Sequence, residues 1–354
     1  MFNLEGILRS NIKGLTPYSS ARDEFKGEAD IFLDANENSL GSSITGHKLN
    51  RYPDPLQWKV KEKLGEIKKI NPENIFLGNG SDEAIDILIR AFCNPGKDNM
   101  IILPPTYGMY EVAAEINDVA IKIVNLTEAF QLNLQGINAS IDKNTKLIFV
   151  CSPNNPTGGT INRNDTISLL KNFNGIVVVD EAYIDFADTP SMVNELNNYP
   201  NLLVMQTFSK AWGLAGLRVG MAFASKPIID VMNKIKAPYN VGDLAQKLVL
   251  QALENKDKVN EMVLLIKQER AKLVKELSSF PFIKNIITSE ANFLLVKTTC
   301  ADKLYDFLIQ NNVVVRNRSK LPLCEGGLRI TVGTPDENRK LLTLLNTFGK
   351  AYKA

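Results

Sequence analysis

One lysine of this 354-residue sequence lies among small and hydroxyl-bearing residues. Lys210 follows Thr207 and Ser209, three glycines come after it, and Arg218 stands eight residues further on. A lysine amine can form an imine with an aldehyde, while hydroxyls and guanidinium groups bind phosphate. Small residues let a backbone and a ligand approach closely. The stretch predicts an imine-forming lysine beside a phosphate, although alone it is as typical of a solvated lysine in a loop.

Other polar motifs follow short apolar runs that alternate with helical segments up to about residue 225. This alternation predicts a largely parallel sheet covered by helices on both faces, and such sheets bind ligands at the carboxyl ends of their strands. Tyr107, Asn155, Asp180 and Tyr183 lie in these motifs, so we expect them to meet Lys210 at one edge of the sheet. The predicted strands are 100–103, 120–124, 147–150, 176–179, 202–205 and 219–223.

A glycine-rich turn, Gly78-Asn79-Gly80-Ser81, stands between the apolar run at 75–77 and a helical pattern at 84–92. A turn of this kind that leads into a helix presents free N–H groups to an anion. An ordinary turn capped by Ser81 explains the same residues, and a dinucleotide fingerprint is absent because the third glycine is missing. The expected phosphate site comprises Gly80, Ser81, Asp82, Thr207, Ser209 and Arg218.

These residue types meet the needs of pyridoxal 5'-phosphate (PLP). That cofactor needs an amine, an anion near its pyridine nitrogen, donors to its ring oxygen and a phosphate site. Lys210 can supply the amine and Asp180 the anion. Asn155 and Tyr183 are suitable donors, and Tyr107 offers a flat face for stacking. Taken alone, Asp180 is better explained as a helix cap or a surface acid, because charged residues are mostly exposed.

The motifs resemble those of fold-type-I PLP-dependent aminotransferases, and within them the histidinol-phosphate aminotransferases. The resemblance rests on residues 152–158 (SPNNPTG), 180–183 (DEAY) and 207–218 (TFSKAWGLAGLR), and it extends from 17–22 to 326–334. It implies a reversible transfer of an amino group in histidine biosynthesis. Glutamate and imidazole-acetol phosphate would give 2-oxoglutarate and L-histidinol phosphate.

The resemblance also implies a role for each site residue. Lys210 would be the Schiff-base lysine and would move the proton, Asp180 would pair with the pyridinium, and Tyr183 would bind the ring oxygen together with Asn155. Tyr107 would stack on the ring. The implied phosphate ligands are Gly80, Ser81, Asp82, Ser209 and Arg218, with Tyr52 reaching over from the other subunit of a homodimer. The implied substrate ligands are Tyr18, Asn155, Arg316 and Arg329.

The substrate arginines leave alternatives open. Arg316 and Arg329 lie at β-rich runs, where an arginine often only keeps an edge strand soluble, and Arg318 could take the place of Arg316. Guanidinium groups bind both carboxylate and phosphate. An aromatic aminotransferase and a threonine-phosphate decarboxylase are alternatives within the fold. A non-catalytic PLP-binding regulator would need a DNA-binding module, and only about 30 residues precede the first expected strand, which begins at Ile31.

Length and patterning predict two domains. We expect a large α/β domain at 31–240 and a smaller α+β domain formed by 1–30 and 241–354. The second region carries helical patterns near 244–253 and 259–277 and β-rich runs near 293–296, 313–315 and 328–332.

Charge and cysteine usage exclude several classes of protein. Lys and Arg number 41 against 39 Asp and Glu, which argues against nucleic acid or an anionic membrane surface as partner. No signal-peptide core or bilayer-length apolar run is visible, so we expect a cytoplasmic protein. The four scattered cysteines and the single histidine, His47, favour buried thiols in a reducing compartment over disulfides or a metal site.

Overall fold

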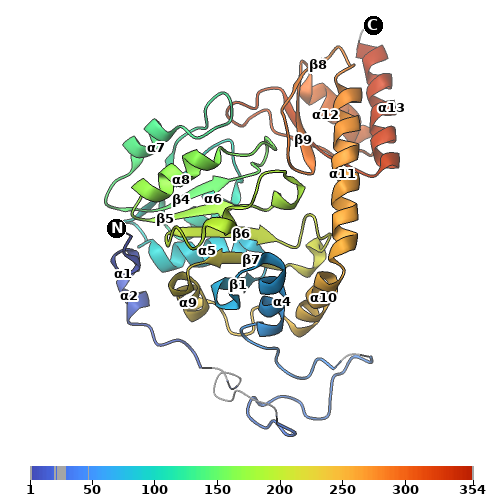
Figure 1. The fold of residues 1–354 in the computed structure, drawn as a ribbon. Coiled ribbons are helices and arrows are strands. Elements are labelled where there is room, and N and C mark those ends of the chain that lie inside the picture. The colour runs from blue at the N-terminus through green and yellow to red at the C-terminus, as the bar shows by residue number, and fades with distance from the viewer. Residues whose placement is uncertain (1, 20, 22–28, 47, 353–354) are drawn as a thin grey trace.

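The computed structural model describes residues 2–19, 21, 29–46 and 48–352 (Figure 1). His47, and Arg22 of the motif at 17–22, lie outside the described residues. Within that part of the chain, no helix is both long and apolar enough to cross a membrane. All four cysteines are buried and free, which confirms the prediction of buried thiols.

A seven-stranded sheet forms the centre of the larger domain, in the order β1-β7-β6-β5-β4-β2-β3. Strands β2 to β6 pair in parallel, whereas β7 runs antiparallel to both β1 and β6. Every run predicted between residues 100 and 223 matches a strand and extends at most one residue beyond it at either end, and the fold class is confirmed. The strands are β1 Ile75–Gly78, β2 Asn99–Ile102, β3 Ala120–Ile123, β4 Thr145–Cys151, β5 Ile176–Asp180, β6 Leu202–Thr207 and β7 Gly220–Ala224.

Helices cover both faces of this sheet because its strands are apolar on both sides. Successive side chains of a strand point to opposite faces, so Val177 and Val179 pack in one buried cluster and Val178 in another. The first cluster includes α4 (Trp58–Lys68), α7 (Leu134–Ser140), α8 (Arg163–Asn172) and α10 (Asp243–Glu254). The second includes α5 (Ser81–Phe92), α6 (Met109–Ile116) and α9 (Lys226–Ile235).

The smaller domain has an antiparallel four-stranded sheet in the order β10-β11-β9-β8. Its strands are β8 Ile283–Ile286, β9 Phe293–Thr298, β10 Arg316–Asn317 and β11 Gly327–Thr331, and it is covered by α12 (Ala301–Gln310) and α13 (Pro335–Tyr352). The strand predicted at 313–315 is wrong, because pairing starts only at Arg316. Val315 is buried in the apolar cluster of this domain without a strand partner.

One long helix joins the two domains. Helix α11 (Lys256–Leu277) has 22 residues and is therefore about 33 Å long; Figure 1 shows it running along one side of the molecule from α10 to the smaller domain. Val259 packs in the core of the large domain, whereas Leu273 and Leu277 pack in the core of the small one. The helix is therefore part of both cores.

The N-terminal segment differs from its predicted grouping. Helices α1 (Leu4–Ile7) and α2 (Ser10–Lys13) lie on the large domain, where Leu8 and Ile12 join the cluster around α5. The backbone amide of Arg9 donates to Ala91 O at 3.1 Å. The strand expected at Ile31 is also wrong: residues 31–33 have no regular structure, because no described strand lies beside them to pair with.

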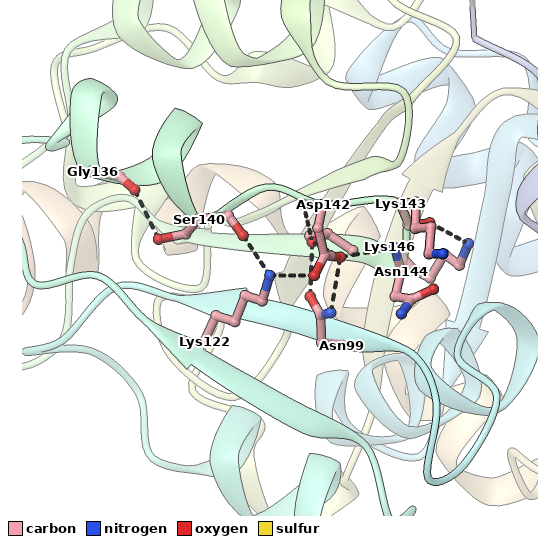
Figure 2. A network of polar contacts seen from close by, with 9 residues as sticks. Asn99, Lys122, Gly136, Ser140, Asp142, Lys143, Asn144 and Lys146 are labelled. Atoms are coloured by element: carbon pink, nitrogen blue, oxygen red, sulfur yellow. Dashed lines mark hydrogen bonds and ion pairs between the residues drawn. The ribbon is translucent and has the colours of Figure 1, made fainter.

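A polar network joins the amino ends of β2 and β4 to Lys122 of the neighbouring strand β3 (Figure 2). Asp142 accepts from Lys122 Nζ at 2.7 Å and from Asn99 Nδ2 at 3.1 Å, and Thr145 Oγ1 donates to Asn99 Oδ1 at 2.8 Å. The hydrogen bond from Lys122 is the main reason why the pKa of Asp142 is lowered. These contacts connect the first residues of β2 and β4 to β3.

Candidate active site

A cavity of about 130 Å³ opens at the carboxyl ends of β4, β5 and β6, beside the start of α5. Its lining brings together residues that are up to 138 positions apart, from Gly80 to Arg218. Cys151 and Ala182 line it as well. The predicted residues that line it are Gly80, Ser81, Asp82, Tyr107, Asn155, Asp180, Tyr183, Thr207, Ser209, Lys210 and Arg218.

Asp180 is a buried carboxylate at the end of β5, with only 3 % of its surface exposed. Its Oδ2 accepts from Tyr110 Oη at 2.6 Å and its Oδ1 from the Ala182 amide at 3.1 Å. Burial raises its pKa, and these two donors oppose the rise. No lysine or arginine among the described residues lies within ion-pair distance of it. The cavity therefore contains a buried acid that has hydrogen-bond donors but no cation.

Lys210 follows β6 and lies at the solvent side of the cavity. Its Nζ is 5.6 Å from the centre of the Tyr183 ring. Its pKa is lowered, first by loss of hydration inside the cavity and then by the positive charge of Arg329. A lowered pKa increases the fraction of neutral amine, and the neutral amine is the form that attacks an aldehyde or accepts a proton.

A chain of hydrogen bonds connects this cavity to the small domain. Asn155 Nδ2 donates to Tyr183 Oη at 3.4 Å, and Arg329 Nη1 donates to Asn155 Oδ1 at 2.6 Å. The Arg329 guanidinium also lies 5.3 Å from the centre of the Phe293 ring, which packs edge-on against Tyr183 at 5.0 Å. Arg329 comes from β11 and Phe293 from β9, so both domains build this side of the site.

The start of α5 forms the opposite side. Gly80 is the N-cap with φ of 81°, and no side chain caps the first amides. The alternative of a turn capped by Ser81 is therefore wrong. Arg218 Nη2 lies 3.6 Å from Asp82 Oδ2, and Tyr107 Oη donates to Asp82 Oδ1 at 3.2 Å. Uncapped amides, a helix dipole and an arginine together suit a phosphate.

Four predicted residues do not line this cavity: Arg329, which reaches it only through Asn155, and Tyr52, Tyr18 and Arg316. Tyr52 is 51 % exposed, and its ring stacks on Tyr239 with centres 4.6 Å apart. Tyr18 is 73 % exposed and borders a different cavity, of about 580 Å³, together with Trp58. Arg316 is exposed on β10, where it lies opposite Arg329 in the strand register.

A further side chain contacts the site residues directly but was not predicted from the sequence. Tyr110, which holds Asp180, is fully buried in α6. It lies three positions after Tyr107, which precedes the helix, and the two ring centres are 5.6 Å apart. That spacing was the only available signal, and it did not show which group the hydroxyl binds.

The residues present fit PLP, the group that the resemblance implies. Asp180 lacks the cation that a protonated pyridine nitrogen would supply, and the free amides of α5 lie beside Arg218. Lys210 offers an amine with a lowered pKa in the same cavity.

Comparison with known proteins agrees with this geometry. Residues 30–345 match the family described as aminotransferase class I and II. A histidinol-phosphate aminotransferase of Cytophaga hutchinsonii is 56 % identical over 347 residues, which cover 98 % of this chain and 99 % of that protein. The chain belongs to the histidinol-phosphate aminotransferases. The enzyme of that name from Parabacteroides distasonis is 52 % identical, over 98 % of this chain and 99 % of its own.

Solved structures of histidinol-phosphate aminotransferases share the fold. The enzyme from Clostridium acetobutylicum has a TM-score of 0.79 at 28 % identity, with 86 % of this chain and 92 % of that chain covered. The enzyme from Sinorhizobium meliloti, solved in complex with pyridoxal-5'-phosphate, has a TM-score of 0.78 at 21 % identity, over 89 % and 90 % of the two chains. The predicted family is confirmed.

Substitution of Gly220 tests the close contact that shapes the phosphate side of this aminotransferase. A Cβ at Gly220 would lie 2.2 Å from Ser81 N and 2.5 Å from Gly80 C, so G220A must push β7 away from the turn that starts α5. We expect the free energy of unfolding to fall by about 1–3 kcal/mol and PLP to bind more weakly, as measured by urea unfolding and cofactor titration.

The matched control is G216A in the same segment, because a Cβ there meets nothing within 4 Å. If G220A unfolded and bound PLP like G216A, the close contact would not shape the site.

Proposed function

We propose that this chain transfers the amino group of glutamate to imidazole-acetol phosphate, giving 2-oxoglutarate and L-histidinol phosphate, with PLP as cofactor. One observation carries the proposal: a lysine amine, a buried carboxylate without a cation and uncapped helix amides beside an arginine share one cavity. The relatives that are 48–56 % identical over nearly the whole chain support this substrate.

Lys210 would move the proton in this reaction. PLP, when bound, supplies an aldehyde that captures an amine and a ring that accepts the electron pair left at the substrate Cα. Lys210 Nζ would take the Cα proton and deliver it to the adjacent cofactor carbon. Its lowered pKa favours the neutral amine, which this step requires.

Asp180 would keep a proton on the pyridine nitrogen. A carboxylate in a buried site interacts strongly with a cation placed beside it, because there is little water to screen the pair. Its two donors, Tyr110 Oη and the Ala182 amide, hold the carboxylate in one orientation. The acid that is costly to bury alone thus becomes part of an ion pair.

The remaining residues would orient the cofactor. Asn155 Nδ2 and Tyr183 Oη, 3.4 Å apart, can both reach one ring oxygen. Tyr107 would stack on the ring. The phosphate would be held by the first amides of α5, by Ser209 and by Arg218.

Three arginines near the cavity support an anionic substrate. Arg316 and Arg329 face each other across β10 and β11, and the pKa of Arg329 is lowered by burial and then by the charges of Arg318 and Arg316. Within the described chain no carboxylate forms an ion pair with any of the three. Like charges placed opposite each other in a sheet are unfavourable. A substrate that carries a carboxylate or a phosphate would relieve this repulsion.

A substrate panel on the purified PLP-loaded protein tests the reaction. We expect glutamate with imidazole-acetol phosphate to give 2-oxoglutarate and L-histidinol phosphate in equal amounts, measured by coupled assay and mass spectrometry. Phenylpyruvate should be the poorer acceptor, since it lacks a phosphate for the arginines.

Two outcomes of the panel would contradict the proposal. Faster turnover of phenylpyruvate would indicate an aromatic aminotransferase. Release of carbon dioxide from threonine phosphate, without an amino acceptor, would indicate a decarboxylase; one such enzyme shares the fold at 21 % identity and a TM-score of 0.73.

Removal of the lysine tests its role. We expect K210A to lose the visible absorbance of the lysine-bound cofactor and to lower kcat by at least ~10³-fold, because it removes both the amine and the proton carrier. K171A, at an exposed lysine of α8, is the matched control. Retention of both signals in K210A would overturn the assignment.

We further propose a cytoplasmic homodimer. The arm at 29–46 and 48–54 leaves the body of the molecule (Figure 1) and exposes apolar side chains, with Leu40 at 99 %, Leu33 at 83 % and Ile31 at 74 %. Apolar surface of this extent favours burial against another chain, and Tyr52 lies at the end of the same arm. The four buried, free cysteines suit a reducing compartment.

Sedimentation at assay concentration should give twice the chain mass of 39.3 kDa. An L33D/L40D double variant should shift the protein toward monomer while α11 and both sheets stay folded. A monomeric wild type would contradict the proposal.

A further inference from the structure

The hydroxyl of Tyr110 donates to the carboxylate of the proposed PLP site, and the Cys151 thiol also lies close enough to interact with it. The Oη–Oδ2 distance of 2.6 Å is at the short end of the range for O–H···O bonds and is typical of an ionised acceptor. Tyr110 is 0 % and Asp180 is 3 % exposed. Water therefore cannot replace this bond if the hydroxyl is removed.

The surroundings of Tyr110 fix the direction of its hydroxyl. Its ring stacks on Phe149 of β4 with centres 4.7 Å apart and meets Tyr107 edge-on at 5.6 Å. Helix α6 carries the tyrosine to the carboxyl ends of the strands, where Asp180 ends β5. Both rings are apolar, so packing holds the tyrosine while the hydroxyl points at the acid.

We propose that Tyr110 is a positioning residue that holds Asp180 as an oriented anion for the pyridine nitrogen of PLP. The inference rests on the proposed PLP chemistry and extends it to a residue outside the cavity lining. Burial favours the neutral form of an acid. A donor that bonds only the ionised form well acts against burial, and so keeps the carboxylate ready to pair with a cation.

Other groups around Asp180 cannot replace this donor. Asp82 disfavours its charge, while Lys210 favours it over a longer distance. Burial keeps the pKa of the Tyr110 hydroxyl well above its usual range, so it remains a donor at every pH at which the protein is folded. The charged or titratable groups that influence the acid are Asp82 from α5, Tyr107 and Tyr110 from the α6 segment, Cys151 from β4, and Tyr183 and Lys210 from the strand ends.

The test uses Y110F and pyridoxamine 5'-phosphate, a ligand that cannot form an imine with Lys210. We expect its Kd to rise by about 10-fold to 100-fold, the range that corresponds to loss of one hydrogen bond to a charged group. Without the donor the pKa of Asp180 rises further, so its carboxyl stays protonated to higher pH. The loss of affinity should therefore be largest at acidic pH and should shrink as pH rises.

A double-mutant cycle shows whether Tyr110 acts through Asp180. In a D180N background the addition of Y110F should change Kd by less than about twofold, because D180N has already removed the carboxylate charge that the Tyr110 hydroxyl stabilises. Y199F, at a half-buried tyrosine outside the cavity, controls for loss of a hydroxyl. Circular dichroism checks that Y110F, which keeps the ring and its stacking, folds like the wild type.

Each result decides the inference. A wild-type Kd in Y110F, a loss that is equal at all pH values, or an equal loss in the D180N background would overturn it, because Tyr110 would then be a packing residue. If the wild type itself bound neither pyridoxamine 5'-phosphate nor PLP, the proposed function would fail instead.

Discussion

A carboxylate buried at the end of a hydrophobic strand is the constraint on which the rest of the site depends. Strand β5 is buried at all five positions, and its last residue is Asp180. An isolated charge in such a place is costly unless it is paired and hydrogen-bonded. The fold supplies the hydrogen bonds through Tyr110 and Ala182, but none of the described residues places a cation within ion-pair distance. A ligand with a protonated ring nitrogen completes the arrangement.

The parallel register explains why chemistry from distant parts of the chain gathers around this acid. Asp180 lies beside Cys151 of β4 and Met205 of β6, so the loops that follow the three strands begin at one level. Asn155 and Lys210 are each a few residues beyond those ends. Strand β7 returns antiparallel, and the absence of a side chain at Gly220 brings it against the turn at Gly80. Thus the phosphate side closes on the same edge.

Strands and helices that depend on the local sequence pattern could be predicted. Features that depend on contacts with distant segments of the chain could not. The run at 176–179 is short, rich in valine and apolar at every position, which favours a strand covered on both faces. The apolar run at 31–33 looks similar but has no neighbouring strand. Strand β8 has polar residues at two of its four positions, IKNI, so its pattern is too weak to detect. The same reason applies to the site: helical spacing puts Tyr110 inside, yet nothing in sequence shows that its hydroxyl meets Asp180.

Arg329 connects the substrate side of the site to its acid–base chemistry. It donates to Asn155 at 2.6 Å, and its charge is the second cause, after burial, of the lowered pKa of Lys210. An anion bound by Arg329 would offset part of that charge and so raise the proton affinity of Lys210. Because linkage is reciprocal, a proton taken up by Lys210 would also strengthen binding of the anion. Lys210 would thus be a neutral amine before substrate binds and a stronger base after it binds. Removal of the Cα proton requires this sequence of states.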